Sequence, residues 1–218
     1  AVLSGRIAAE TVKAAQEEGI YCFLKHFALN DQEINRNFQL TVWTTEQGAR
    51  EGYLRAFEYP VKEGNATAIM SSFNYIGHEW AGASNSLLNK ILRDEWGFRG
   101  MVVSDAAMEG YNYINGDQAI RNGGDAIHNI DLTRDTAIKD TESATSVLAM
   151  RNATHNVLYT VANSNAYKGA ESNSIATLEV IFYTCLGLVT VLMIIAEIIT
   201  IIKYRKREKG IINIDSNN

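Results

Sequence analysis

The stretch "LRDEWGFRGMVVSD", residues 92–105, contains the end of one predicted helix, a turn and a short apolar run. Gly97 follows the helical pattern and is the residue type that most often ends a helix. The run "GMVVSD" (100–105) opens with Gly and ends in Ser104-Asp105, which predicts a buried strand with polar groups at its end. The helix itself is indicated by apolar residues at helical spacing: Leu87, Leu88, Ile91, Leu92 and Trp96.

The same alternation of helix and strand extends in both directions from this stretch. Helices are predicted over 6–18, 45–63, with Pro60 kinking its end, and 143–162. Strands are predicted in "GIYCFLKHF" (19–27), "TAIMSSFN" (67–74) and "DAIHNID" (125–131). This order indicates an α/β fold with a parallel sheet. The last helix is expected to bury Val147, Leu148, Val157, Leu158 and Val161 on one face.

Three of the four predicted strands end in polar clusters: Lys25-His26, Asn74 and Ser104-Asp105. This asymmetry is typical of a (β/α) barrel, which carries its site at the C-terminal ends of the strands. An open doubly wound sheet would also place ligands there, but the chain has no Gly-rich phosphate loop. Four strands cannot close an eight-stranded barrel, so we expect a partial barrel whose other strands lie outside this chain.

Composition excludes several classes of protein. The chain has 218 residues, 46% of them apolar and 21% charged, which indicates a globular protein. A net charge of −5 argues against a nucleic-acid partner. Cys22 and Cys185 do not suggest a disulfide framework, and no Cys/His cluster has zinc spacing. The N-terminus lacks the pattern of a signal peptide and an initiator Met, so the chain is expected to begin inside a longer protein.

Residues 180–202, "VIFYTCLGLVTVLMIIAEIITII", form an apolar segment with one charge, Glu197. As a helix it would span about 35 Å, enough to cross a bilayer core of about 30 Å. Its length argues against the alternative of a buried core helix. The basic flank "KYRKREKG" (203–210) places the C-terminus in the cytoplasm and the preceding residues outside the cell membrane. Glu197 near the cytoplasmic end is expected to reach the interface or a neighbouring helix, and a functional intramembrane carboxylate is the alternative.

Two long motifs connect the chain to a known family. "KHFALNDQEINR" (25–36) and "LRDEWGFRGMVVSD" (92–105) resemble glycoside hydrolase family 3, the β-glucosidase group, and "IMSSFNYI" (69–76) matches the strand between them. The resemblance covers about residues 1–163. It implies that Asp105 is the catalytic nucleophile and that Lys25, His26 and Arg36 bind the hydroxyls of the terminal sugar.

The resemblance also implies that Phe73 and Asn74 lie beside the nucleophile. Many members have Tyr where this chain has Phe73, and Trp where it has Ala106, so a hydroxyl donor and an aromatic surface found in those members are absent at these two positions. Retaining glycosidases need a carboxylate nucleophile and a carboxylic acid about 5–5.5 Å apart. Without the motif, Asp105 reads as a helix cap and Lys25-His26 as an ordinary strand end. Lys25 is also expected to favour the ionised form of Asp105.

Other carboxylates are expected to be structural. Asp31 and Glu33 are assigned to the loop after the first strand, and Asp94 and Glu95 to a solvated helix face. Asp125 and His128 are assigned to the barrel rim, with substrate contact as the alternative. No residue of the chain is assigned as the acid/base. The resemblance implies that this group comes from another domain, which would have to precede this chain.

These inferences define the following prediction. Residues 1–163 form about four C-terminal β/α units of a (β/α)8 barrel domain, 164–179 a linker, 180–202 a single transmembrane helix and 203–218 a basic cytoplasmic tail. The protein is a membrane-anchored, outward-facing, exo-acting retaining β-glycosidase that needs no metal or organic cofactor, and this chain alone is expected to be inactive. Its partners are a β-linked glycoside, the bilayer and the missing part of the same protein. The alternative is a non-catalytic, membrane-anchored carbohydrate-binding protein with a degenerate barrel.

Overall fold

The computed structural model describes residues 1–131, 133, 135–166 and 173–215, and the side chains of 173–178 and 205–215 are not described. The chain divides into two units, Ala1–Gly169 and Ala170–Asn218. Residues 167–172 of the predicted linker and the last three residues of the predicted tail lie outside the described residues.

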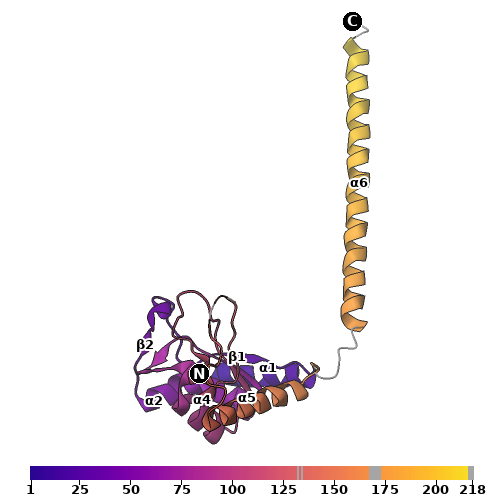
Figure 1. The fold of residues 1–218 in the computed structure, drawn as a ribbon. Coiled ribbons are helices and arrows are strands. Elements are labelled where there is room, and N and C mark those ends of the chain that lie inside the picture. Colours follow the sequence, from indigo (N-terminus) through magenta and orange to yellow (C-terminus); the bar gives the residue numbers. More distant parts are fainter. Residues whose placement is uncertain (132, 134, 167–172, 216–218) are drawn as a thin grey trace. The chain divides into compact units, whose positions relative to one another are not determined.

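Three parallel strands form the centre of the first unit. β1 (Phe23–Phe27), β3 (Ala68–Ser71) and β6 (Met101–Val103) pair in the order β1-β3-β6. Ala68 lies opposite Phe23 on one side and Met101 on the other. Three of the four predicted strands are therefore confirmed. Figure 1 shows the main helices of this unit and long loops that extend away from them.

The fourth predicted strand, 125–131, lies at the predicted place in the sequence, but it does not form a regular strand. Only two isolated parallel bridges, Val103 to Ala126 and Ala107 to Asn129, join this segment to β6 and the residues after it. The amide of Val102 donates to the carboxylate of Asp125 at 2.6 Å. A side chain thus takes a backbone donor that a regular ladder would use, which explains the interrupted pairing.

Helices surround this sheet at the expected places. α1 (Val2–Glu17) precedes β1, and the predicted helix at 45–63 is confirmed as three continuous parts, α2 (Glu46–Gly48), a π-helical η2 (Ala49–Leu54) and α3 (Arg55–Lys62). It begins where the side chain of Thr45 accepts from the amide of Gly48 at 3.1 Å. The other helices of this unit are η4 (Ser86–Glu95), also π-helical, α4 (Gly116–Arg121), α5 (Ala144–Ala162) and two short 3-10 helices, η1 (Arg36–Phe38) and η3 (Ala81–Ala83).

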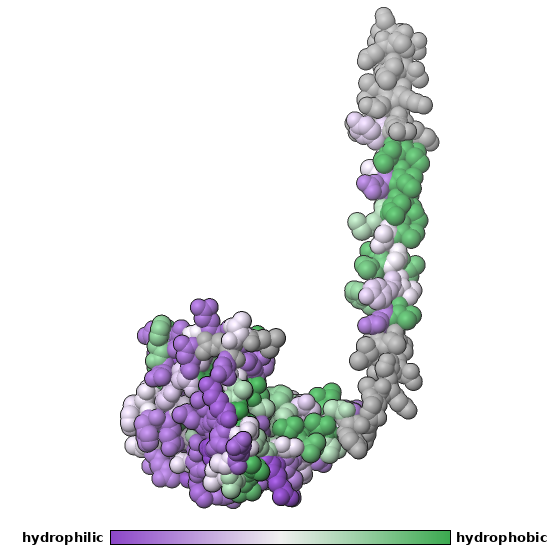
Figure 2. All heavy atoms as spheres, viewed as in Figure 1, coloured by the Kyte–Doolittle hydropathy of each residue, from purple (hydrophilic) through white to green (hydrophobic). Residues whose placement is uncertain are grey.

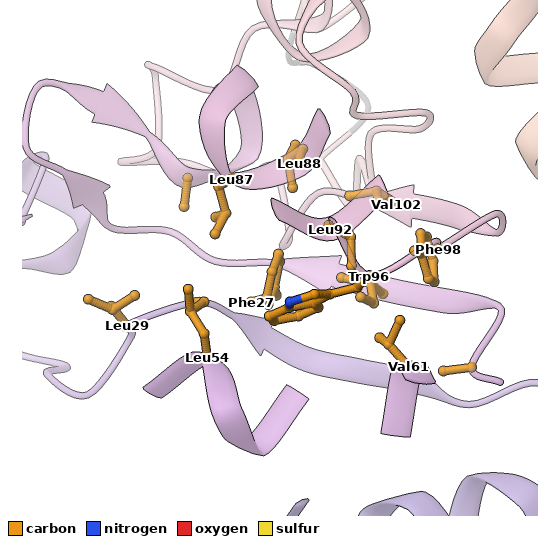
Figure 3. Close-up of a cluster of buried hydrophobic side chains, with 14 of the residues drawn as sticks. Phe27, Leu29, Leu54, Val61, Leu87, Leu88, Leu92, Trp96, Phe98 and Val102 are labelled. Carbon is orange, nitrogen blue, oxygen red and sulfur yellow. The ribbon is translucent and has the colours of Figure 1, made fainter. Parts of the chain in front are cut away.

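The main core lies between β1, β6 and the helices that flank them. Phe27 is completely buried, and its ring meets Phe57 and Trp96 edge-on at centroid distances of 5.1 and 5.9 Å. Figure 3 shows Trp96 lying against Phe27, with aliphatic side chains on both sides. Leu92 and Trp96 come from the helix that the opening motif predicted, so the apolar spacing there did identify the buried face.

Gly100 lies where the turn before β6 passes closest to β3. A Cβ atom at this position would stand 1.8 Å from the carbonyl oxygen of Thr67, far inside any allowed contact. The two backbones approach closely because Met101 donates its amide to the same oxygen at 3.0 Å. Only glycine fits at this crossing.

We expect Gly100→Ala to destabilise the protein by more than about 3 kcal/mol, because relieving the clash requires moving a backbone carbonyl of the central sheet. Urea unfolding of the full chain measures this change. Gly52→Ala is the matched control, since a Cβ at that helical position meets nothing within 4 Å. Equal stability of the two variants would contradict the close approach.

The buried face of α5 differs from the prediction. Its buried residues are small or polar, Ser146, Ala153 and Thr160, while Val147, Leu148 and Leu158 are about half exposed or more. The Thr160 hydroxyl donates to the carbonyl of Thr67 at 2.6 Å and accepts from the amide of Met101 at 2.9 Å. Helix α5 therefore packs on the polar starts of two strands, and apolar periodicity did not identify that face.

A second, small sheet was not predicted. It consists of β2 (Thr41–Val42), β4 (Tyr75–Ile76) and β5 (Glu79–Trp80), with β2 parallel and β5 antiparallel to β4. β4 and β5 form a hairpin across Gly77-His78, where Gly77 has a φ of +61°. The sequence feature that could have predicted this hairpin is "YIGHEW" (75–80), in which the dipeptide Gly-His lies between two pairs that each contain an aromatic residue.

The second unit contains one long helix, α6 (Asn173–Asp215). Its stretch Glu179–Tyr204 is 26 residues long, and by length and composition it is sufficient to cross a membrane. The side chains of this stretch are exposed, and Figure 2 shows most of them as apolar, with weakly polar and hydrophilic ones in between. A helix over the predicted 180–202 is thus confirmed, and the helix continues into the segment predicted as a tail.

Candidate active site

Asp105 lies two residues beyond the end of β6. Only 7% of the residue is exposed, and its Oδ1 accepts from the amide of Ala106 at 2.8 Å. Ser104 fixes the turn, because its hydroxyl donates to the Asp105 carbonyl at 2.7 Å and accepts from the amide of His128 at 3.0 Å. Oδ2 is buried and has no hydrogen-bond partner among the described residues. One carboxylate oxygen is thus anchored and the other is not.

His26 is the closest charged or titratable neighbour of that second oxygen. Its Nε2 lies 3.4 Å from Oδ2 of Asp105, although the angles do not form a hydrogen bond. Burial of the ring lowers the pKa of His26 below 6.5, and this effect outweighs the opposing attraction of Asp105. The lowered pKa favours the neutral imidazole, which can act as a polar partner of Asp105.

Lys25 precedes His26 on β1 and is exposed. Cis peptide bonds join Lys25 to His26 and Phe27 to Ala28. Among the described residues, the Lys25 ammonium forms no hydrogen bond or ion pair. Its positive charge contributes to lowering the pKa of His26. Lys25 thus lies next to His26 at the end of β1 with its side chain exposed, and its role in sugar binding stays a prediction.

Arg36 reaches the same region from the short 3-10 helix η1 (Arg36–Phe38). Its guanidinium is held on three sides: Nε donates to the Tyr111 hydroxyl at 3.0 Å, Nη1 pairs with Glu33 at 2.7 Å, and the group lies 4.8 Å from the centre of the Phe73 ring. The planar guanidinium suits this combination of stacking and directed bonds.

Phe73 and Asn74 lie under this group and are buried. The Phe73 ring stacks on Tyr111 with centroids 4.0 Å apart. Asn74 donates to the carbonyl of Ala28 at 3.2 Å, which ties the end of β3 to the end of β1. Both predicted residues are therefore beside the site, where they support other groups.

Two tyrosines that the sequence analysis did not identify complete the cluster. Tyr111 holds Arg36 and Phe73, and the hydroxyl of Tyr113 donates to the Phe73 carbonyl at 2.8 Å. Burial raises the pKa of Tyr113 well above 10, so this hydroxyl remains a donor. In the sequence, the feature that could have identified them is the spacing of two tyrosines two positions apart in "EGYNYIN" (109–115), shortly after Asp105.

Several of the other carboxylates have partners within the protein. Glu33 pairs with Arg36, and Asp125 is buried against Arg93 at 2.7 Å. Glu95 lies on an exposed helix face, as predicted, and there it forms a two-point pair with Arg50 at 2.7 and 2.9 Å. Within the described part of the chain, no group of three or more His, Cys, Asp or Glu side chains is placed to hold a metal ion.

Comparison with known proteins gives the family. Residues 2–155 match the model of the glycosyl hydrolase family 3 N-terminal domain. The chain is 41% identical over 103 residues to β-glucosidase B of Emericella nidulans, and 40% identical over 103 residues to an exo-α-(1→6)-L-arabinopyranosidase of Bifidobacterium breve. Each alignment covers 47% of this chain.

A solved structure supports the same assignment. A β-glucosidase from Kluyveromyces marxianus has a TM-score of 0.66 and 30% identity over 79% of this chain. The chain belongs to glycosyl hydrolase family 3, in its N-terminal domain. It spans only 12% and 14% of the two curated relatives and 21% of the solved chain.

Proposed function

We propose that this chain carries the nucleophile and the terminal sugar subsite of an exo-acting retaining β-glycosidase of the β-glucosidase type. The observation that carries the proposal is the pair formed by Asp105 and His26 at the ends of two parallel strands. Oδ2 of Asp105 is buried and lacks a hydrogen-bond donor, which suits an atom that must attack a carbon atom.

The reaction proceeds by double displacement. Oδ2 of Asp105 bonds to the anomeric carbon while the bond from that carbon to the leaving oxygen breaks. The leaving oxygen takes a proton from an acid group that this chain does not supply. Water then adds to the anomeric carbon, releases Asp105 and gives its proton to the same group, now acting as base. No metal or organic cofactor enters these steps.

The neighbouring residues take distinct roles. Lys25 and the neutral His26 donate hydrogen bonds to sugar hydroxyls, and Arg36 provides further donors from the opposite loop. Phe73 and Asn74 support Arg36 and the strand ends. The relatives include enzymes named for glucose and for arabinopyranose, so the family likeness leaves the sugar open.

Residues 1–163 would then be about four units of a (β/α)8 barrel. The remaining strands and the acid/base would come from other parts of the same protein, and this chain alone would be inactive. The three paired strands and the bridged segment 125–131 support this interpretation. A closed barrel of this kind needs eight strands, so the other four would have to come from elsewhere.

We also propose that residues 180–202 anchor the enzyme in the cell membrane with its catalytic part outside and its basic C-terminal segment in the cytoplasm. The apolar length of α6 and the basic residues after it support this orientation. Protease added to intact cells tests it: a C-terminal epitope is expected to be protected and one before Ala1 to be cleaved. The opposite pattern would overturn the orientation.

Arg36→Lys is expected to raise KM for an aryl β-glucoside about tenfold or more, because an ammonium cannot stack on Phe73 while bonding both Tyr111 and Glu33. Steady-state kinetics of the full-length protein measure this. Arg50→Lys, in an ion pair between helices, is the matched control. An unchanged KM in Arg36→Lys would remove Arg36 from the sugar subsite.

The second candidate is a non-catalytic, membrane-anchored carbohydrate-binding protein with a degenerate barrel. The observation that favours it is the presence of Phe73 and Ala106 where many family members have Tyr and Trp, beside the lack of an assigned acid/base in this chain. A 2-deoxy-2-fluoro glycoside discriminates between the two, because a retaining enzyme keeps the sugar covalently attached. Peptide mass analysis is expected to find the label on Asp105, and reversible binding alone would support the binding protein.

A further inference from the structure

The apolar stretch of α6 carries a line of polar side chains along one side. Four of them recur every seven residues, and the other two lie four positions before the first and the last of these, so all share one side of the helix. In Figure 2 the hydrophilic side chains in view lie mainly along one edge of this stretch. We call this line the polar stripe. It consists of Glu179, Tyr183, Thr190, Glu197, Thr200 and Tyr204.

Glu197 is the member of the polar stripe that most needs a partner if α6 crosses a membrane. It lies six residues before Lys203, which is about 9 Å along the helix from the basic segment. Side chains of a helix lean toward its N-terminus, so that of Glu197 leans away from this nearer end. Among the described residues its carboxyl group forms no hydrogen bond or ion pair, and lipid chains offer none. A second helix beside α6 would supply the missing partner.

The seven-residue spacing indicates how such a second helix runs. Seven residues of a straight α-helix fall about 20° short of two turns, so the polar stripe drifts slowly around α6. Two helices that wind around each other with a left-handed twist compensate for this drift and keep the stripe in contact along its length. Left-handed pairs of this kind are also the commonest packing of helices in membranes. The stripe therefore has the period of a helix-pairing surface.

We propose that the polar stripe is the contact surface of a parallel α6 dimer, formed with a second copy of this chain. Two copies that enter the membrane with the same orientation pair in parallel, so residues with the same number meet at the same depth. Thr190 then meets Thr190, and the two Glu197 carboxyl groups can share one proton in a hydrogen bond between them. Each position of the stripe thus finds a complementary group in the second copy. The inference rests on the proposed membrane anchor and not on the proposed catalysis.

Thr184 offers a matched control for Thr190 in a crosslinking test. Both hydroxyls donate to the backbone carbonyl four residues earlier, at 2.8 Å for Thr190 and 2.6 Å for Thr184, but Thr184 lies off the polar stripe. The test uses the full-length protein in membranes, with its native cysteines replaced. Thr190→Cys is expected to form a disulfide-linked dimer under a mild oxidant, and Thr184→Cys is not, because a disulfide needs Cα atoms within about 7 Å.

Electrophoresis without reductant measures the crosslinked product. Equal crosslinking at the two positions, or none at either, would overturn the dimer. A product of Thr190→Cys whose mass differs from twice that of the chain would assign the stripe to a different protein and also overturn it. Release of the parent protein from membranes by alkaline carbonate would instead count against the proposed anchor.

Two variants of Glu197 test the carboxyl pair itself. Glu197→Leu is expected to lower the association constant about tenfold, as for loss of one hydrogen bond between membrane helices. Glu197→Gln should associate like the parent, because an amide both donates and accepts. Energy transfer between labelled copies in detergent micelles measures both constants. Unchanged association in Glu197→Leu would remove Glu197 from the contact surface.

Discussion

Replacing Asp105 with Asn in the full-length protein is expected to lower kcat for aryl β-glucosides by at least about ten-thousandfold, as for other removed nucleophiles. The amide has nearly the same shape, so the contact with the Ala106 amide and the surrounding turn should persist. Only the capacity to form the bond to the anomeric carbon is lost. Steady-state kinetics with a nitrophenyl glycoside measure the change.

Asp94→Asn is the matched control for this substitution. Asp94 carries an exposed carboxylate that pairs only with Lys90 at the surface of η4, so its loss should leave kcat unchanged. Circular dichroism of both variants separates catalytic loss from unfolding. If Asp105→Asn retained hydrolysis in a protein whose parent is active, another group would have to be the nucleophile.

Replacing Asp125 with Ala is expected to destabilise the full chain by about 3–5 kcal/mol, the usual cost of removing one partner of a buried ion pair. The Asp125 side chain is 2% exposed, and its carboxylate receives hydrogen bonds from Arg93 of η4, the amide of Val102 in β6 and Asn156 of α5. Burial raises the pKa of this carboxyl despite the cation beside it.

Urea unfolding gives the free energy of unfolding for this comparison, with Asp94→Ala as the control. The control removes an exposed ion pair and is expected to change stability by less than about 1 kcal/mol. A similar small change in Asp125→Ala would show that the three elements are held together by packing alone. Catalysis by the folded fraction should remain, since Asp125 lies outside the site.

Apolar runs and glycine positions were sufficient to predict the three paired strands and most helices. The apolar runs in "TAIMSSFN" and "GMVVSD" correspond to mostly buried strands. "GIYCFLKHF" was also predicted as a buried strand, but in β1 Phe23 and Lys25 are exposed and only Phe27 is buried. The fourth strand was predicted as regular because its pattern does not reveal that Asp125 takes the Val102 donor. The face of α5 was missed because it packs through Ser146, Ala153 and Thr160, which carry little apolar signal.

In the site, too, residues next to a predicted strand could be identified from the sequence, whereas contacts between distant segments could not. Lys25, His26 and Asp105 are marked by strand ends, and the family motif supplied their proposed roles. Tyr111 lies 75 positions from Arg36, and only the fold shows that its hydroxyl holds that guanidinium. The exposed position of Glu95 was predicted correctly, but its partner Arg50 comes from another helix and was not predicted.

The way α5 is attached has a mechanical consequence if α6 anchors the protein. Thr160 bridges the backbones of Thr67 and Met101, and Asn165 bonds the end of α1 through Glu18 and Gly19. Force on the chain beyond Asn165 would therefore act on the hydrogen bonds of Asn165 to Glu18 and Gly19 before it reached those of Thr160. If α6 is an anchor, these bonds separate it from the strand ends that carry Asp105 and His26.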